Sequence, residues 1–272
     1  MRVHLRGVAV WGPGLPGWTA SRPILAGAAP YAPDRTPPPA PAILSPTERR
    51  RTGIAVRLAL AVAQQVTGMA GLPPDTLRSV FGSANGDGAV VHAILETLAG
   101  SERAVSPTQF HNSVHNAAAG YWTIATGSAA PASCLGCHDA TFGAALLTAA
   151  AEVACEAAPV LLVVYDAPLP APLAGKRWTE DEFAAAFVLS PEPAGAFAAL
   201  EVAFAAAPAT PEIEEPRQQA LRALSRRNPA ARALRLLEAI ARAAPDAMCA
   251  GLLDGRVDVT VTPCSTAPPF SG

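Results

Sequence analysis

The sequence predicts an α/β protein in which a mixed central sheet is covered by helices on both faces. Apolar strand-like runs alternate with Ala-rich helical runs between Val3 and Tyr165, an order that favours a mainly parallel, covered sheet. The run from 160 to 164 is apolar at every position, as expected for a strand buried on both faces. Together these patterns indicate a layered protein rather than a helical bundle or a closed barrel.

Composition excludes several classes of protein. Half of the 272 residues are apolar and 15% are charged, which is typical of a globular chain with one large core or two small ones. The net charge of −2 gives no basic field for nucleic acid. The longest apolar run, near 157–165, is too short for a membrane span. The N-terminal residues lack the long apolar core of a signal peptide, and the odd count of five cysteines argues against a secreted disulfide framework. We therefore expect a cytoplasmic protein.

Local signals place the elements along the chain. Ser45, Pro46 and Glu48 have the form of an N-cap, a first helical position and a capping box. We expect strands at 3–11, 78–84, 160–165, 184–189, 196–205 and 256–261, with 184–189 and 196–205 forming a pair, and a further strand before a turn at 139–140. We expect helices at 45–69, 89–98, 113–126, 140–157, 212–226 and 230–243, with a loop at 101–112. Residues 1–205 are predicted as one domain and 206–272 as a helical extension with a final strand.

The string Cys134-Leu-Gly-Cys137-His138 permits several readings. It matches the C-x-x-C-H signature of c-type haem attachment, although no export signal is visible. The same three side chains, completed by His111 or His115, would make a zinc site, but no second Cys/His pair follows. Cys137 beside a histidine is also a conceivable nucleophile, and two small core cysteines are the structural alternative. We expect no metal and no cofactor.

Two longer segments carry a family resemblance. Residues 106–122 read SPTQFHNSVHNAAAGYW, and residues 138–147 read HDATFGAALL before a long Ala-rich stretch. A loop and helix with an Asn and an Ala-Gly pair, then a strand, a sharp turn and an Ala-rich helix, resemble the centre of a β-ketoacyl synthase. The resemblance covers about residues 3–205. It implies a thiolase-like half domain.

The resemblance also implies that the catalytic centre is lost. In the family a nucleophilic cysteine occupies the sharp turn, and matching the Ala-rich helices on 149–152 places that position at about Ala140, within one or two residues. Asp139 and Ala140, which best fit the turn, cannot form an acyl thioester. The family's two histidines come from a second half that this chain stops too early to contain, and no histidine follows His138. Cys137 would then precede the turn and point into the core, and Asp139 has the alternative role of a helix N-cap.

A synthase-like chain without a nucleophile resembles a chain-length factor, in particular the small β-ketoacyl synthase N-terminal-like subunit of aryl polyene clusters. The expected partners are a full-length β-ketoacyl synthase, forming a heterodimer, and an acyl carrier protein. The resemblance implies a tunnel gate made of Gln109, Phe110, His111 and Asn112, and an interface containing His115, Asn116, Tyr121 and Trp122. Helix capping and core packing are the structural alternatives for the interface set. The alternative function is an independent thiolase-fold acyltransferase that uses Cys137. Arg49, Arg50 and Arg51 are predicted as a solvated helix face, with carrier-protein binding as the functional alternative.

Overall fold

One mixed sheet runs through the part of the chain that the structure, a computed structural model, describes: residues 1–34, 37, 40–101, 103–177, 179–206 and 214–264. Its strand order is β4-β3-β5-β6-β1-β7-β9-β8, with β2 paired to β1. The strands are β1 (Arg2–Gly12), β2 (Leu15–Pro16), β3 (Arg78–Gly82), β4 (Ala132–Leu135), β5 (Val160–Asp166), β6 (Phe183–Ser190), β7 (Ala198–Ala205), β8 (Asp246–Leu252) and β9 (Gly255–Pro263).

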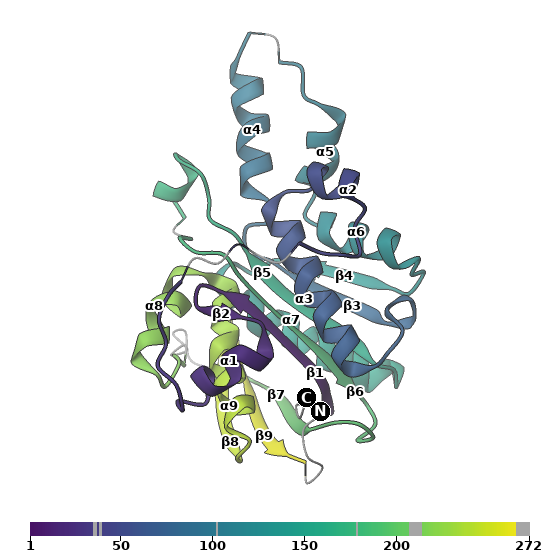
Figure 1. The fold of residues 1–272 in the computed structure, drawn as a ribbon, viewed down its shortest axis with the longest axis vertical. Helices are drawn as coiled ribbons and strands as arrows, with labels where there is room; N and C mark the ends of the chain where they lie inside the picture. The colour runs from purple at the N-terminus through teal and green to yellow at the C-terminus, as the bar shows by residue number, and fades with distance from the viewer. Residues whose placement is uncertain (35–36, 38–39, 102, 178, 207–213, 265–272) are drawn as a thin grey trace.

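Helices cover both faces of this sheet (Figure 1). They are α1 (Trp18–Leu25), α2 (Pro46–Arg51), α3 (Ile54–Ala70), α4 (Gly88–Ala99), α5 (Pro107–Ser113), α6 (Ala117–Thr126), α7 (Thr141–Glu156), α8 (Gln219–Arg227) and α9 (Leu234–Arg242), with short 3-10 turns at 74–76, 138–140, 173–175 and 229–233. The buried side chains of α3 and α6 pack on one face of the sheet, and those of α7, α9 and α1 pack on the other. Alternate residues of β5 point to opposite cores: Leu162 to one and Leu161 to the other. The predicted mixed sheet with helices on both faces is confirmed.

Two details of the sheet differ from the prediction. Only the β3–β4 and β3–β5 pairs are parallel, and the other pairs are antiparallel, so the expected mainly parallel sheet is wrong. The strands β6 and β7 do not pair with each other, because β1 lies between them and bonds to both. The first strand of the chain is buried at almost every position, and a strand that is apolar on both faces packs better inside a sheet than at its edge.

The first long helix is shorter than predicted. The capping box is confirmed: the Ser45 hydroxyl accepts from the Glu48 backbone N–H at 3.2 Å, and the Glu48 carboxylate accepts from the Ser45 N–H at 3.1 Å. The helix then stops at Thr52, which is extended, and restarts at Ile54. A Cβ on Gly53 would lie 1.7 Å from the carboxylate of Asp87, so only glycine allows α3 to begin against the segment that leads into α4.

Other elements were missed or misplaced. The helix α5 replaces the loop expected at 101–112, and α6 begins at Ala117 rather than Ser113. The helix α1 and the strand β8 had no predicted counterpart. The strands β8 and β9 extend the same sheet beyond β7, and α9 packs on α1. The proposed division of the chain at residue 206 stays a prediction.

The helices α4 and α5 project from the body of the molecule (Figure 1). Gly88 is the only buried residue of α4, although the rest of that helix is largely apolar. In the described part of the chain α4 packs mainly on α5, and α5 packs on α6. We call α4 and α5 together the arm.

Candidate functional site

A strand, a sharp turn and a buried helix form the centre of the site. The strand β4 ends at Leu135, a 3-10 turn spans His138–Ala140, and α7 begins at Thr141. The apex of the turn is His138, whose φ of 52° lies in the left-handed region, a strained conformation for a histidine. The Thr141 hydroxyl holds the turn by accepting from the Cys137 backbone N–H at 3.0 Å and donating to the His138 carbonyl at 2.6 Å.

The predicted turn residues lie here, but with new roles. Asp139 and Ala140 are inside the 3-10 turn, while the strained apex is two residues before Ala140. Asp139 does not cap α7, so the N-cap prediction is wrong. Its carboxylate accepts from Arg177 Nη2 at 2.9 Å instead. The N-cap position of α7 is Ala140, so Asp139 lies one residue before it.

Cys137 lies one residue before the apex and is half-buried. It is the residue at which the 3-10 turn begins, so its thiol is not at the first turn of α7. The side chain that the turn presents outward is that of His138, which is 64% exposed. A strand-to-helix turn with an exposed side chain at a strained apex is the geometry in which other enzymes place a nucleophile; in this chain that position carries an imidazole.

A buried carboxylate that sequence reasoning missed lies behind the turn. Asp166, at the end of β5, is 0% exposed. Its oxygens accept from the Ser83 hydroxyl at 2.9 Å and from the backbone N–H groups of Asn85 and Ala84 at 3.0 and 3.3 Å. Burial raises the pKa of Asp166 to about 6, although these three hydrogen bonds and the charge of Arg177 act in the opposite direction. A lone acidic residue directly after the apolar run 160–165 was the available sequence signal.

Arg177 connects this carboxylate loop to the turn. Its Nε donates to Asn85 Oδ1 at 2.9 Å, its Nη2 to Asp139, and its Nη1 to the Nε2 of His138. The Asn85 amide also donates to Thr179 Oγ1 at 3.0 Å. Because Arg177 has only donors, the Nε2 of His138 is the acceptor in this contact. We call Asn85, His138, Asp139 and Arg177 the Arg177 cluster.

The four predicted gate residues all lie on α5. Phe110 is 67% exposed, whereas Asn112 is buried. Asn112 is structural: its amide donates to the Arg51 carbonyl at 2.6 Å and its Oδ1 accepts from the Tyr121 hydroxyl at 3.0 Å. His111 packs edge-on against Tyr121, with 5.8 Å between ring centroids, and Gln109 is half-buried. Within this set, Phe110 is the apolar side chain that faces solvent.

The four predicted interface residues separate into surface and core. His115 and Asn116 are exposed, and Tyr121 is half-buried. His115 Nε2 is 2.9 Å from the Ser83 carbonyl oxygen. Trp122 is 1% exposed and belongs to the core beneath α6, so it offers no surface to a partner in this structure.

The large apolar side chain that α6 does expose is Ile124, at 66%. Sequence reasoning missed it. Its spacing of two residues from Trp122, the large buried side chain of the same helix, was the signal.

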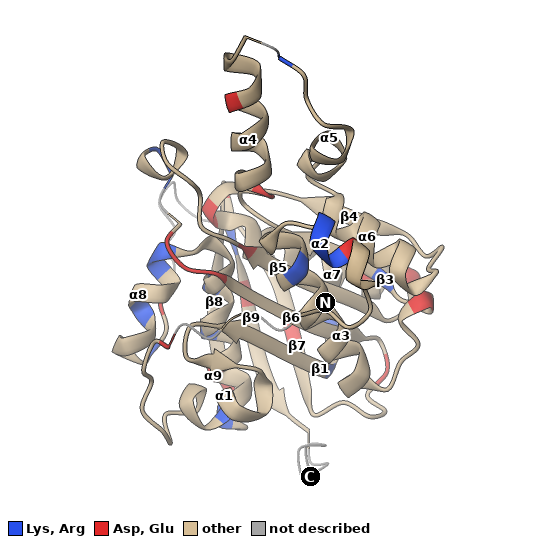
Figure 2. Ribbon diagram, turned by 45° about the horizontal axis from the view of Figure 1, so that its top comes forward, with Lys and Arg blue, Asp and Glu red and all other residues tan. Residues whose placement is uncertain are grey.

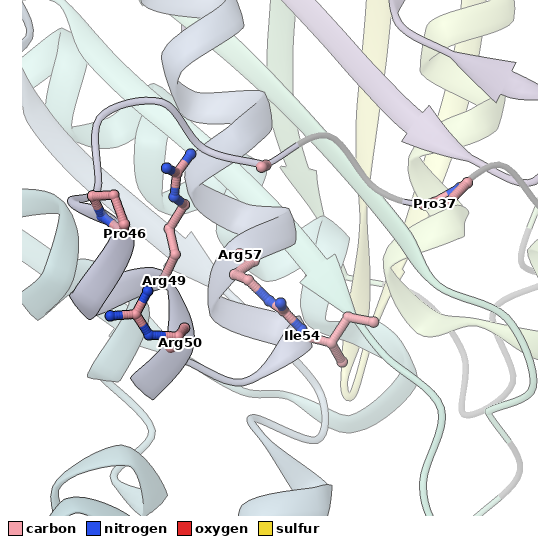
Figure 3. A pocket seen from close by; sticks show the side chains of 7 residues that line it. Pro37, Pro46, Arg49, Arg50, Ile54 and Arg57 are labelled. Atoms are coloured by element: carbon pink, nitrogen blue, oxygen red, sulfur yellow. The ribbon is translucent and has the colours of Figure 1, made fainter.

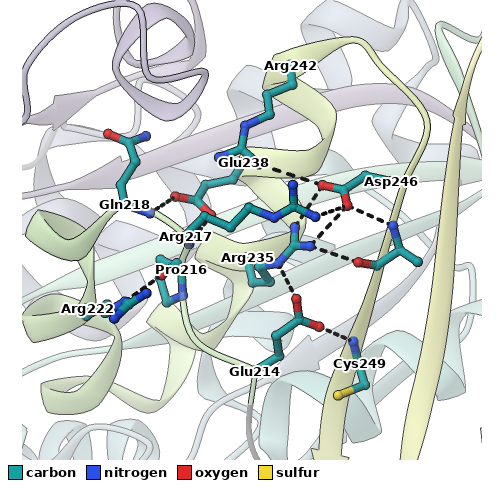
Figure 4. Close-up of polar contacts among 11 residues, drawn as sticks. Glu214, Pro216, Arg217, Gln218, Arg222, Arg235, Glu238, Arg242, Asp246 and Cys249 are labelled. Atoms are coloured by element: carbon teal, nitrogen blue, oxygen red, sulfur yellow. Dashed lines mark hydrogen bonds and ion pairs between the residues drawn. The ribbon is translucent and has the colours of Figure 1, made fainter.

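The two edges of the sheet are treated differently. At the β8 edge, side chains bond the outward backbone: the Glu214 carboxylate accepts from the Cys249 N–H at 2.8 Å, and Arg235 Nη2 donates to the Ala247 carbonyl at 2.8 Å (Figure 4). Arg235 is itself buried and paired with Asp246 and Glu214. At the other edge, β4 pairs with β3 alone in the described sheet. An open edge strand is a template for strand addition.

A basic cleft lies beside α2. It has a volume of about 560 Å³ and is lined by Arg49, Arg50 and Arg57 together with Pro37, Ala40, Pro46 and Ile54 (Figure 3). The Arg57 Nε is buried and makes no hydrogen bond among the described residues. Basic residues gather on α2, below the arm (Figure 2). The cleft can receive an anionic group, and its apolar side chains can contact the uncharged part of the same ligand.

The next two observations concern metal sites and membrane-spanning helices. No group of three or more His, Cys, Asp or Glu side chains in the described residues is arranged to hold a metal ion. Among the helices of the described segments, none combines the length and apolarity needed to cross a bilayer.

Comparisons place this geometry among known proteins. The model of the β-ketoacyl synthase N-terminal domain matches residues 26–247. A search of curated proteins finds no match. A solved complex of the ketosynthase ApeO with its chain length factor ApeC from Xenorhabdus doucetiae contains a chain similar to this one, with a TM-score of 0.72, 19% identity, and coverage of 96% of this chain and 99% of that chain.

Two further solved complexes show the same fold. The ishigamide ketosynthase/chain length factor has a TM-score of 0.69 at 16% identity, covering 96% of this chain and 99% of that one. The type II polyketide complex AntDE:AntF, an acyl carrier protein with its ketosynthase bound to the hexaketide, has a TM-score of 0.72 at 14% identity, covering 97% and 99%.

Proposed function

We propose, from the premise that this chain belongs to the β-ketoacyl synthase N-terminal domain family, that it is a non-catalytic, chain-length-factor-type subunit. It pairs with an active β-ketoacyl synthase as a heterodimer in the cytoplasm, in a chain-assembly system of the aryl polyene or fatty-acid type. One observation carries the proposal: the strained apex of the strand-turn-helix holds His138, whose Nε2 accepts from Arg177, where acyl transfer would require a free thiolate.

The surroundings of the turn support the absence of chemistry. The outward side chain of the apex is bonded to Arg177, and Asp139 beside it is paired with the same guanidinium. The nearest thiol, that of Cys137, precedes the apex and does not receive the field of the α7 N-terminus. Within this sequence no histidine follows His138. The turn retains its shape while its side chains bond to one another.

The open side of the sheet supports the proposed partner contact. The edge strand β4, the exposed Ile124 of α6 and the exposed Phe110 of the arm belong to consecutive elements of the chain. A stable subunit interface needs a sizeable, well-packed apolar patch, and these elements supply two exposed apolar side chains and the open edge of β4. The solved ketosynthase–chain length factor pairs are complexes of two similar chains, which fits this arrangement.

The basic cleft supports a contact with the acyl carrier protein. Arg49 and Arg50 of α2 line it together with apolar Ile54, the first residue of α3, a combination suited to an acidic surface and an uncharged ligand chain. One of the solved complexes is that of a carrier protein with its ketosynthase. We assign the arginines of α2 to carrier docking rather than to a merely solvated face.

Co-purification tests the function. The chain is co-expressed with a full-length β-ketoacyl synthase of the same organism, and the mass of the complex is measured by light scattering. Ile124→Asp should abolish the complex, because it buries a charge in the interface. Leu253→Asp is the matched control, since Leu253 is equally exposed, at 69%, on the far β8–β9 hairpin.

The activity of the isolated chain gives the second readout. It should take no acyl group from a carrier protein, and Cys137→Ala should change nothing. Acylation that disappears in Cys137→Ala would overturn the proposal and establish the independent acyltransferase instead.

A further inference from the structure

Beyond its first residues, the helix α4 of the arm makes few contacts with the body of the molecule. This helix buries only Gly88, and it packs mainly on α5 among the described elements. A helix without a buried face derives little stability from packing. The arm joins the body at two places: at residues 83–87 before α4, and at the end of α5, where Asn112 bonds to the Arg51 carbonyl and the Tyr121 hydroxyl.

The base of the arm is bonded on its inner side to Asp166. The carboxylate binds the Ser83 hydroxyl and two consecutive backbone N–H groups, and the Ser83 hydroxyl in turn accepts from the Gly86 N–H at 2.9 Å. These bonds fix the backbone of the loop but not the orientation of α4 relative to the turn at 138–140. The Asn85 side chain adds a link between this loop and the turn.

Asn85 reaches the turn only through Arg177. The guanidinium binds Asn85 with Nε and the turn residues His138 and Asp139 with Nη1 and Nη2. A planar guanidinium presents its donors in a fixed fork, so binding both sides at once fixes the distance and angle between them. The Arg177 side chain is 22% exposed, against 44% for Asp139, so this ion pair is partly shielded from solvent.

We propose that Arg177 is a positioning residue: it uses the degenerate nucleophile turn as a fixed support for the α4 side of the arm, while Asn112 holds the α5 side that carries Phe110, and the two attachments together set the angle at which the arm meets the partner. The role of Arg177 is argued from the contacts of the Arg177 cluster and does not depend on the proposed function. Its consequence for chain length rests on the function proposed above. The turn is thus retained for support in a chain that no longer uses it for chemistry.

Hydrogen–deuterium exchange of the isolated, full chain tests the positioning role without a partner. In Arg177→Ala, the amides of α4 and α5 should exchange at least about tenfold faster, the effect of losing charge-assisted hydrogen bonds at the base. Exchange in α3 and β5 should stay within about twofold of wild type. Arg226→Ala is the matched control, because it removes an exposed arginine of α8 that pairs with Glu215.

Two further variants keep the test decisive if Arg177→Ala does not fold. Asn85→Ala removes the arm side of the connection and Asp139→Ala removes the turn side, and each should accelerate exchange in the arm. Unchanged arm exchange in all variants that fold overturns the proposal.

The partner complex supplies a readout that a purely structural role would not move. With the ketosynthase bound, Arg177→Ala should broaden the distribution of acyl chain lengths on the carrier protein while assembly persists. A loosened arm with no complex in wild type would leave the positioning role intact and refute the proposed function. An unchanged distribution in an assembled complex would refute the link to chain length.

Discussion

The buried carboxylate of Asp166 should give the protein a distinct dependence of stability on pH. Its pKa is raised from 3.8 to about 6 by burial. Because the folded-state pKa lies above the unfolded one, the stabilising contribution is complete below pH ~4 and is lost as the pH rises through ~6. The difference of about two pKa units corresponds to ~3 kcal/mol at 1.36 kcal/mol per unit. No discount for solvent applies, since the side chain is 0% exposed.

The substitution Asp166→Asn isolates this contribution. The amide cannot ionise, so the free energy of unfolding of the variant should lose the fall of ~3 kcal/mol between pH 4.5 and 7. The free energy of unfolding of the variant should also be lower at every pH by about 1–3 kcal/mol. The Asp166 Oδ2 atom now accepts a hydrogen bond from the Ala84 N–H, and in the variant the amide NH₂ would face that donor instead. Wild type must be compared with Asp166→Asn, because other carboxylates change the stability with pH in the opposite direction. The pKa of Asp246, for example, is lowered with the help of its pair with Arg235.

Urea unfolding followed by circular dichroism at half-unit steps of pH provides the measurement. Subtracting the two stability curves removes every titration that both proteins share. Parallel curves for wild type and Asp166→Asn would show that Asp166 does not titrate in this window and would refute the argument from burial. A difference of the opposite sign would mean that the hydrogen bonds from residues 83–85 outweigh desolvation.

Three other outcomes follow from the site. His138→Cys should be alkylated at least about tenfold faster than Cys155, because the apex lies beside the Arg177 guanidinium and Cys155 lies in the last turn of α7; equal rates would remove the apex from the nucleophile position. Phe110→Ala should lengthen the carrier-bound acyl chains in a complex that still assembles, as seen by mass analysis, and an unchanged distribution would place the gate elsewhere. Arg50→Glu should weaken binding of the carrier protein by about tenfold or more at low salt, with Arg226→Glu as the control; equal affinities would leave α2 a solvated face.

Local signals were sufficient where neighbours in sequence decide the structure. The capping box at Ser45 and the buried strand β5 were predictable because their partners lie within a few residues or because an apolar run determines burial on both faces. The helix α5 begins with Ser106 and Pro107, the same pair that was recognised at α2, so its signal was present. The break at Gly53 was not predictable, since it arises from a carboxylate 34 positions along the chain, at Asp87.

The site depended more heavily on contacts distant in sequence. Asn85 and Arg177 are 92 positions apart in the sequence, and Asp139 and Arg177 are 38 positions apart. No periodic pattern in the sequence predicts contacts over such separations. The sequence limited the nucleophile turn to within two residues of Ala140, but the apex at His138 depends on a backbone φ that only the structure shows. Trp122 was predicted at an interface because aromatic bulk favours interfaces, yet the face of α6 on which it lies is the buried one.

The unequal edges of the sheet limit how far association can proceed. At β8 the outward backbone is already bonded by the side chains of Glu214 and Arg235, so no further strand can add there without breaking charged contacts. At β4 one strand can add, and the two chains then present only their far, occupied edges. If a second chain with the same occupied edge adds through its own β4, sheet-to-sheet growth terminates at two chains instead of continuing as a filament. The number of chains in such an assembly is then set by which end of the sheet is occupied.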